Sequence, residues 1–101
     1  MGGISNDLHV HFDPQYPLKI SQDINWKEVN SKIDLINVQI FAVVSSEGCV
    51  DLALPLIQSG IQNIDASATR DVFMARFLPA VVDGKPVSAS IVIPIHFTRK
   101  R

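Results

Sequence analysis

The sequence contains little cysteine and no long apolar run. Cys49 is the one cysteine among 101 residues, which excludes an intramolecular disulfide and a cysteine-rich metal site. The longest apolar stretch, residues 38–44, includes a glutamine and falls far short of the roughly 20 residues that span a bilayer. Residues 1–3 also lack the basic and apolar regions of a signal peptide. We therefore expect any membrane anchor or export signal to lie outside this sequence.

An excess of charge of one sign is also absent. The 9 basic and 10 acidic residues leave a net charge of −1, which argues against a nucleic-acid-binding surface. The one basic cluster, residues 99–101, is expected to be a solvated tail, with contact to phospholipid or another polyanion as the alternative. An apolar content of 47% with 19% charged residues is typical of a globular chain. A chain of this length supports one domain with a single modest core.

Residues 34–57 have the pattern of a β-hairpin. Two apolar segments, 34–44 and 49–57, flank the turn residues 45–48, which include Gly48. Apolar segments of this length joined by a short glycine-containing turn are typical of paired antiparallel strands. We therefore expect two neighbouring strands in this region.

The second half of the chain predicts a helix and one further strand. Residues 64–75 carry apolar side chains at helical spacing, and Asn63 or Asp65 can cap the first turn. Pro79 cannot continue the helix. Every odd-numbered residue from 87 to 97 is apolar, and the residues between them are two serines, a valine, a proline and a histidine, so one face of this last strand should lie on the core and the other should face water.

Two prolines predict the order of the strands. Proline has no N–H to donate and is tolerated mainly on edge strands. Pro55 lies in the second strand and Pro94 in the last, whereas the first strand contains no proline. The predicted fold is therefore α+β with ββαβ order: a three-stranded antiparallel sheet, strand order second–first–last, packed on one helix.

The first third of the chain predicts an extended arm. Residues 8–12 alternate as a short strand would, and Pro14 and Pro17 then restrict the backbone to extended or turn conformations. Residues 25–28, Asn25-Trp26-Lys27-Glu28, have the spacing of a capping box and predict one or two helical turns. We therefore divide the chain into an N-terminal arm, residues 1–33, and a domain, residues 34–101.

Several motifs in a fixed order resemble the C-terminal domain of TonB, the energy transducer of Gram-negative bacteria. The family has an acidic-Gly turn, a Ser-Gly end to the second strand, an apolar-Asp helix start and three proline-containing motifs after it. Here these are Glu47-Gly48, Ser59-Gly60, Ile64-Asp65, Arg76-Phe77-Leu78-Pro79-Ala80, Gly84-Lys85-Pro86-Val87 and Pro94-Ile95-His96-Phe97. Upstream, Pro14-Gln15-Tyr16-Pro17 resembles the Pro-x-Tyr-Pro that precedes the family's sheet.

The resemblance implies a non-enzymatic periplasmic domain that takes no cofactor. Such a domain holds the short TonB box of an outer-membrane TonB-dependent receptor, which adds as a strand to the domain's last strand. The resemblance also implies ExbB and ExbD as partners through a transmembrane segment absent from this chain, anchorage in the inner membrane, and a monomer or an intertwined homodimer. The motif residues with an implied structural role are Gly48, Asp65, Arg76, Phe77, Pro79, Gly84 and Pro86.

Strand addition predicts which residues face the partner. An exposed edge offers unpaired N–H and C=O groups, and successive residues point these groups to alternate sides. If Pro94 faces the free edge, so do the other even-numbered residues of the strand, Ser88, Ser90, Val92 and His96. Gln15 and Tyr16 match the family segment that also approaches the box. The predicted partner-binding residues are therefore Gln15, Tyr16, Ser88, Ser90, Val92, Pro94 and His96.

Three alternatives stay open at this point. The first is a stand-alone TonB-like periplasmic interaction domain without energy transduction. The second is that the proline and serines of the last strand only prevent chains from pairing and aggregating. The third is a metal site formed by His9 and His11 with a third ligand such as His96. Because alternation puts His9 and His11 on the polar face of a strand, surface histidines are the favoured interpretation of that pair.

Overall fold

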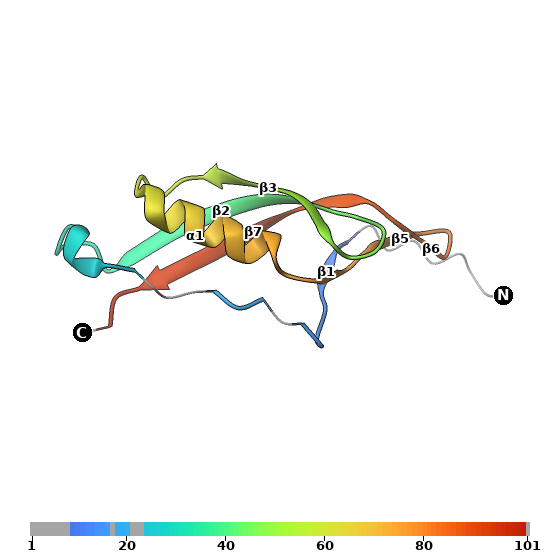
Figure 1. The fold of residues 1–101 in the computed structure, drawn as a ribbon, viewed down its shortest axis with the longest axis horizontal. Helices are drawn as coiled ribbons and strands as arrows, with labels where there is room; N and C mark the ends of the chain where they lie inside the picture. The colour runs from blue at the N-terminus through green and yellow to red at the C-terminus, as the bar shows by residue number, and fades with distance from the viewer. Residues whose placement is uncertain (1–8, 17, 21–23, 101) are drawn as a thin grey trace.

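Three long strands form one antiparallel sheet in the computed structural model, which describes residues 9–16, 18–20 and 24–100. Strand β2 (Leu35–Val44) lies between β3 (Val50–Ile57) and β7 (Ala89–Thr98). Helix α1 (Gln62–Phe73) lies against β3 and β2 (Figure 1). The predicted α+β fold and the order second–first–last are therefore confirmed. Each edge strand contains the proline that marked it as an edge.

The core lies between α1 and one face of the sheet. Along β2, every second side chain from Ile36 to Val44 is buried, and the helix contributes Ile64, Ala68 and Val72, which lie on one face as their spacing predicts. Strand β7 contributes three side chains that are each at most 4% exposed. The buried apolar side chains from the sheet and the helix are Ile36, Val38, Ile40, Ala42, Val44, Val50, Ile64, Ala68, Val72, Ile93, Ile95 and Phe97.

The start of α1 differs from the prediction. The helix begins at Gln62, its N-cap position is Ile61, and no side chain caps it. Asp65 instead lies in the first turn, buried, where its Oδ1 accepts a hydrogen bond of 2.8 Å from the backbone N–H of Ser59. Asp65 therefore ties the segment before the helix to the helix itself, a role that helix spacing alone does not reveal.

The predicted last strand, residues 87–97, is two strands in the structure. Val87 belongs to a hairpin that precedes the long strand in the chain, in which β5 (Ala80–Val82) pairs with β6 (Lys85–Val87). Its two turn residues, Asp83 and Gly84, both have positive φ, 52° and 78°, as a type I′ turn requires. Because Val87 pairs with Ala80 and not with β2, Ser88 separates β6 from β7, and the long strand begins at Ala89 and ends at Thr98.

In its described residues, the N-terminal arm contains a two-residue strand and a short 3₁₀ helix. Strand β1 (His11–Phe12) pairs with β4 (Phe77–Leu78), and the rings of Phe12 and Phe77 lie 5.2 Å apart. The 3₁₀ helix η1 (Trp26–Glu28) begins after Asn25, whose side chain accepts a hydrogen bond from the N–H of Lys27. The predicted strand and helical turn are therefore both present but shorter, and Leu8 of the predicted strand lies outside the described residues. The apolar arm residues that pack against the core are Leu18, Ile20, Ile24 and Trp26.

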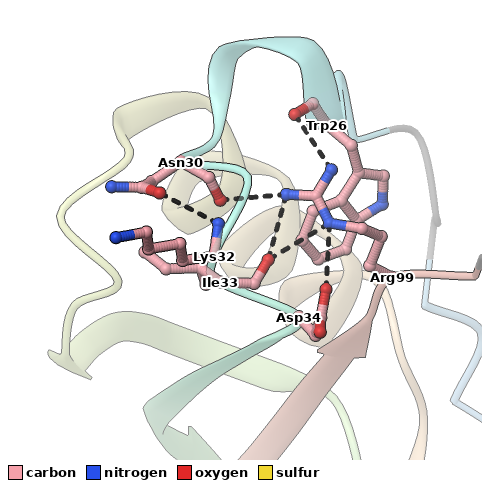
Figure 2. Close-up of polar contacts among 6 residues, drawn as sticks. All are labelled: Trp26, Asn30, Lys32, Ile33, Asp34 and Arg99. Carbon is pink, nitrogen blue, oxygen red and sulfur yellow. Dashed lines mark hydrogen bonds and ion pairs between the residues drawn. The ribbon is translucent and has the colours of Figure 1, made fainter.

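The side chain of Arg99 anchors this arm to the end of the sheet (Figure 2). Its guanidinium donates hydrogen bonds to the carbonyl oxygens of Trp26, Asn30 and Ile33 at 3.0–3.4 Å. It also lies 3.3 Å from Oδ1 of Asp34, and only 15% of the side chain is exposed. The prediction of a solvated basic tail is therefore wrong for Arg99. Its guanidinium N–H groups find acceptors in the carbonyl groups of the arm, which lies nearby in space. Arg101 lies outside the described residues.

Candidate peptide-binding edge

The free edge of β7 is set by the pairing of β7 with β2. The backbone N–H of Arg99 donates a hydrogen bond of 2.8 Å to the carbonyl of Asp34, which lies opposite it when the register is continued by one residue. Along an antiparallel ladder, hydrogen-bonded pairs alternate with pairs whose backbone groups point outward. The register between β2 and β7 has no shift. The alternation therefore runs from Arg99 back to Ala89, so the odd-numbered residues turn their N–H and C=O groups towards β2.

The even-numbered residues of β7 turn their backbone groups to the free edge. Pro94 is one of them, opposite Gln39, and this position explains why the sheet accepts a proline: its missing N–H is not one that β2 needs. Ser88 lies one residue before β7 and outside the paired register. The edge-facing residues within β7 are Ser90, Val92, Pro94, His96 and Thr98.

Thr98 is an edge residue that the sequence prediction omitted. The predicted strand ended at Phe97, whereas β7 extends to Thr98, opposite Leu35. The signal was present, since the alternation of apolar and other side chains continues from Phe97 to Thr98.

The same five β7 residues direct their side chains away from α1. Along β7, these even-numbered residues are exposed, and the side chains that face the core are the odd-numbered ones. We call the sheet face opposite α1 the open face. Nδ1 of His96 contacts Oδ1 of Asn37 across this face. The open face consists of Leu35, Asn37, Gln39, Phe41, Val43, Leu52, Leu54, Ile57, Ser90, Val92, Pro94, His96 and Thr98.

Gln15 and Tyr16 lie at the C-terminal end of α1. Asp13 organises this turn of the arm: its Oδ1 accepts a hydrogen bond from the N–H of Gln15 at 2.9 Å, and its own N–H donates to the carbonyl of Arg76. The guanidinium of Arg76 lies 5.7 Å from the ring centroid of Tyr16. A surface cavity of about 480 Å³ opens here, lined by Gln15, Tyr16, Lys19, Asp71, Met74, Ala75 and Arg76. The cavity lining thus comes from the arm and the end of α1, so these two residues form a place separate from the β7 edge.

Several of the family-like motifs meet at one junction. Gly48 has φ +86°, its carbonyl accepts a hydrogen bond from the N–H of Phe77, and a Cβ at Gly48 would lie 2.1 Å from the carbonyl oxygen of Phe77. The ring of Pro79 is also close to Gly48. Arg76 contacts Sγ of Cys49 at 3.6 Å and the ring of Tyr16. The turn between β2 and β3 is therefore packed against the segment that follows α1, residues 76–79.

The histidines of the alternative metal site lie on the surface of the arm and of β7. His11 is part of β1, and His9, His11 and His96 are all exposed. Over residues 9–16, 18–20 and 24–100, no group of three or more His, Cys, Asp or Glu side chains is arranged to hold a metal ion. Within the same described ranges, no helix is long and apolar enough to cross a membrane.

The fold and the free edge define a class of small α+β domain that can accept an extended peptide as a further strand. A family model for the Gram-negative bacterial TonB protein C-terminal domain matches residues 37–98, more than half of the chain. The chain belongs to this family, a family of non-catalytic, periplasmic transducer domains. The predicted family is therefore confirmed. A comparison with curated proteins finds no match.

Proposed function

We propose that this domain binds the TonB-box peptide of outer-membrane TonB-dependent receptors by strand addition to the free edge of β7. The domain then transmits energy from the proton-motive force to the receptor for uptake of iron-siderophore complexes, haem or similar nutrients. In the full-length protein, a transmembrane segment anchors the domain in the inner membrane and connects it to ExbB and ExbD. The domain itself works in the periplasm as a binding module, without a catalytic step.

The observation that carries this proposal is the free edge of β7 in a chain of this family. The edge offers both backbone groups of Ser90, Val92, His96 and Thr98, and the carbonyl of Pro94. Peptide strand addition takes its affinity from such main-chain hydrogen bonds and its selectivity from alternate side chains. Among the strands of the described residues, β7 pairs with β2 alone, so this row of groups is open to a partner.

The turn residues Gln15 and Tyr16 provide a second contact in this proposal. They lie on a cavity with the cationic side chains of Lys19 and Arg76 beside them. In this proposal, a part of the receptor other than the added strand contacts this cavity. The contact adds polar and aromatic surface to the backbone pairing.

Replacement of Ser90 by proline tests the edge directly. Ser90→Pro removes an edge-facing N–H but no group that pairs with β2, so the fold should stay intact while peptide affinity falls at least about tenfold. Isothermal calorimetry with receptor box peptides measures the affinity, and circular dichroism with thermal unfolding measures the fold. Ser90→Ala is the matched control, because it removes the hydroxyl but keeps the backbone donor, and its affinity should remain that of the unchanged domain.

Two results would contradict the proposal. Undiminished affinity of the folded Ser90→Pro variant would show that the peptide does not pair with this edge. Absence of amide shifts along β7 in an NMR titration with several box peptides would show that the edge does not bind them at all. Energy transduction has its own test: Ser90→Pro in the full-length gene should abolish receptor-dependent nutrient uptake at an unchanged protein level. Unchanged uptake beside lost peptide binding would favour an interaction domain without transduction.

A further inference from the structure

The residues that the register places on the open face carry no charged side chain; the exposed Asp51, which lies unpaired at the irregularity between Val50 and Leu52, is not among them. The 13 residues of the open face come from three strands, and none is Asp, Glu, Lys or Arg. The water-facing side of an antiparallel sheet normally carries polar and charged side chains. Here the exposed side chains include several large apolar ones, each 41–53% exposed, namely Leu35, Leu52, Leu54, Ile57 and Val92. The face is therefore suited to contact with further apolar surface.

One row of side chains crosses the open face from edge to edge. Phe41 in the central strand pairs with Leu54 of β3 on one side and with Val92 of β7 on the other. All three side chains are aliphatic or aromatic, and Val92 is the member at the free edge, 43% exposed. A strand added beside β7 would extend this row by one residue, because directly paired residues of neighbouring strands place their side chains on the same face.

The edge couples backbone pairing to this face. The residues of β7 whose N–H and C=O groups point to the free edge are also those whose side chains lie on the open face. Every second residue of an added strand therefore sits beside one of Ser90, Val92, Pro94, His96 or Thr98, whichever way the strand runs. Along the edge, the neighbouring side chain changes from aliphatic at Val92 to imidazole at His96.

We propose that the open face is the specificity surface of the β7 edge, and that Val92 selects receptor segments with an aliphatic side chain beside it and rejects a charged one. This inference rests on the proposed strand addition and adds to it the side-chain pattern of the partner. A charged side chain at this position would lose part of its hydration against the apolar row of Leu54, Phe41 and Val92. Because no opposite charge in that row compensates the loss, the binding free energy would be less favourable.

A scan of single Glu replacements along a receptor box peptide tests this selection. Against the unchanged domain, Glu at the position beside Val92 should lower affinity about tenfold. Against the Val92→Lys variant, that loss should shrink by about threefold to fivefold at that one position, because the introduced ammonium then faces the carboxylate. The coupling identifies the peptide position beside Val92 whether the peptide binds parallel or antiparallel, and in any register.

Leu52→Lys is the matched control. Leu52 lies on the same face with a similar exposed fraction, 41%, but on β3, two strands from the β7 edge. This variant adds the same charge to the open face, and the Glu scan against it should match the scan against the unchanged domain. Equal coupling to Val92→Lys and Leu52→Lys would show a general charge effect and overturn the selection by Val92.

The inference and the proposed function fail in different ways. If peptides shift the β7 amides but no Glu position couples to Val92→Lys, strand addition stands and the specificity surface is wrong. If no peptide shifts the β7 amides, strand addition itself fails and the inference falls with it. Coupling confined to one position, together with β7 shifts, supports both.

Discussion

The guanidinium of Arg99 lies over the indole ring of Trp26, with 4.7 Å between Cζ and the ring centroid. Arg99 follows the last strand, whereas Trp26 belongs to the N-terminal arm, so this contact joins the end of the sheet to the arm. The hydrogen bonds from the same guanidinium to the carbonyls of Asn30 and Ile33 strengthen the connection (Figure 2). The planar fork of arginine suits several carbonyl groups at once while stacking on a ring, and lysine cannot reproduce this arrangement.

Substitution of Arg99 should therefore loosen the arm. We expect Arg99→Lys to lower the free energy of unfolding by about 1–3 kcal/mol, since several hydrogen bonds and the ring contact are lost. Urea unfolding followed by circular dichroism measures the loss, and the fluorescence of Trp26, the sole tryptophan, should report greater exposure to water. Lys100→Ala, at the exposed neighbour, is the control and should change stability by less than about 0.5 kcal/mol. Equal stability of both variants would refute the anchoring role.

Two glycines with positive φ should respond differently to alanine. Gly48 has φ +86° and faces the carbonyl oxygen of Phe77, whereas Gly84 has φ +78° and open space around it. Gly84→Ala should destabilise the fold by about 1–2 kcal/mol, the effect of a left-handed conformation alone. Gly48→Ala should cost at least about 2 kcal/mol more, because backbone atoms must also move. Thermal unfolding compares the two variants, and similar losses would contradict the close packing of the β2–β3 turn against β4.

Removal of the Asp65 carboxylate should detach the segment before α1. Asp65→Ala leaves the N–H of Ser59 without its acceptor, and we expect a loss of about 1–3 kcal/mol in the free energy of unfolding. Asp65→Asn keeps an acceptor oxygen at the same place and should lose less. Chemical denaturation measures both variants, and hydrogen exchange at Ser59 gives the local effect. A larger loss for Asn than for Ala would show that the side chain acts in some other way.

Pro94 should limit association along the β7 edge. Pro94→Ala adds an N–H that points to the free edge and not to β2, so the sheet should remain paired, with stability changed by about 1 kcal/mol or less. We expect stronger self-association, or tighter binding of box peptides, from the additional donor. Analytical ultracentrifugation measures the first effect and calorimetry the second. Pro86→Ala, on the exposed strand β6, serves as the comparison and should change neither self-association nor peptide affinity. If Pro94→Ala increased neither, the N–H of residue 94 would not point to the free edge.

Local chemistry explains why the sheet could be predicted from the sequence. The apolar residue at every second position from Ala89 to Phe97 and the positions of Pro55 and Pro94 each reflect a property of one residue or of its immediate neighbours. Such properties do not depend on how the rest of the chain folds. The order β3-β2-β7 and the burial of every second residue followed from them.

The errors arose where another segment supplies the partner. Asp65, one of two residues predicted to cap the helix, bonds instead to Ser59, and Val87 was placed in the last strand but pairs with Ala80. Arg99 was expected in water, yet its partners lie more than 60 residues earlier in the chain. Patterns along a sequence carry no information about which carbonyl or strand comes near in space.

The amphipathic edge character of β7 follows from the sequence alone, because alternation and proline chemistry act over a few residues. The family follows in the same way, through motifs that mark turns and ends. The register of β7 against β2 is instead a property of the folded chain. The register also decides which backbone groups turn to the free edge and which side chains lie beside them. That register depends on contacts between Asp34 and Arg99 and along the whole ladder, since pairing two strands is a cooperative property of residues far apart in the chain.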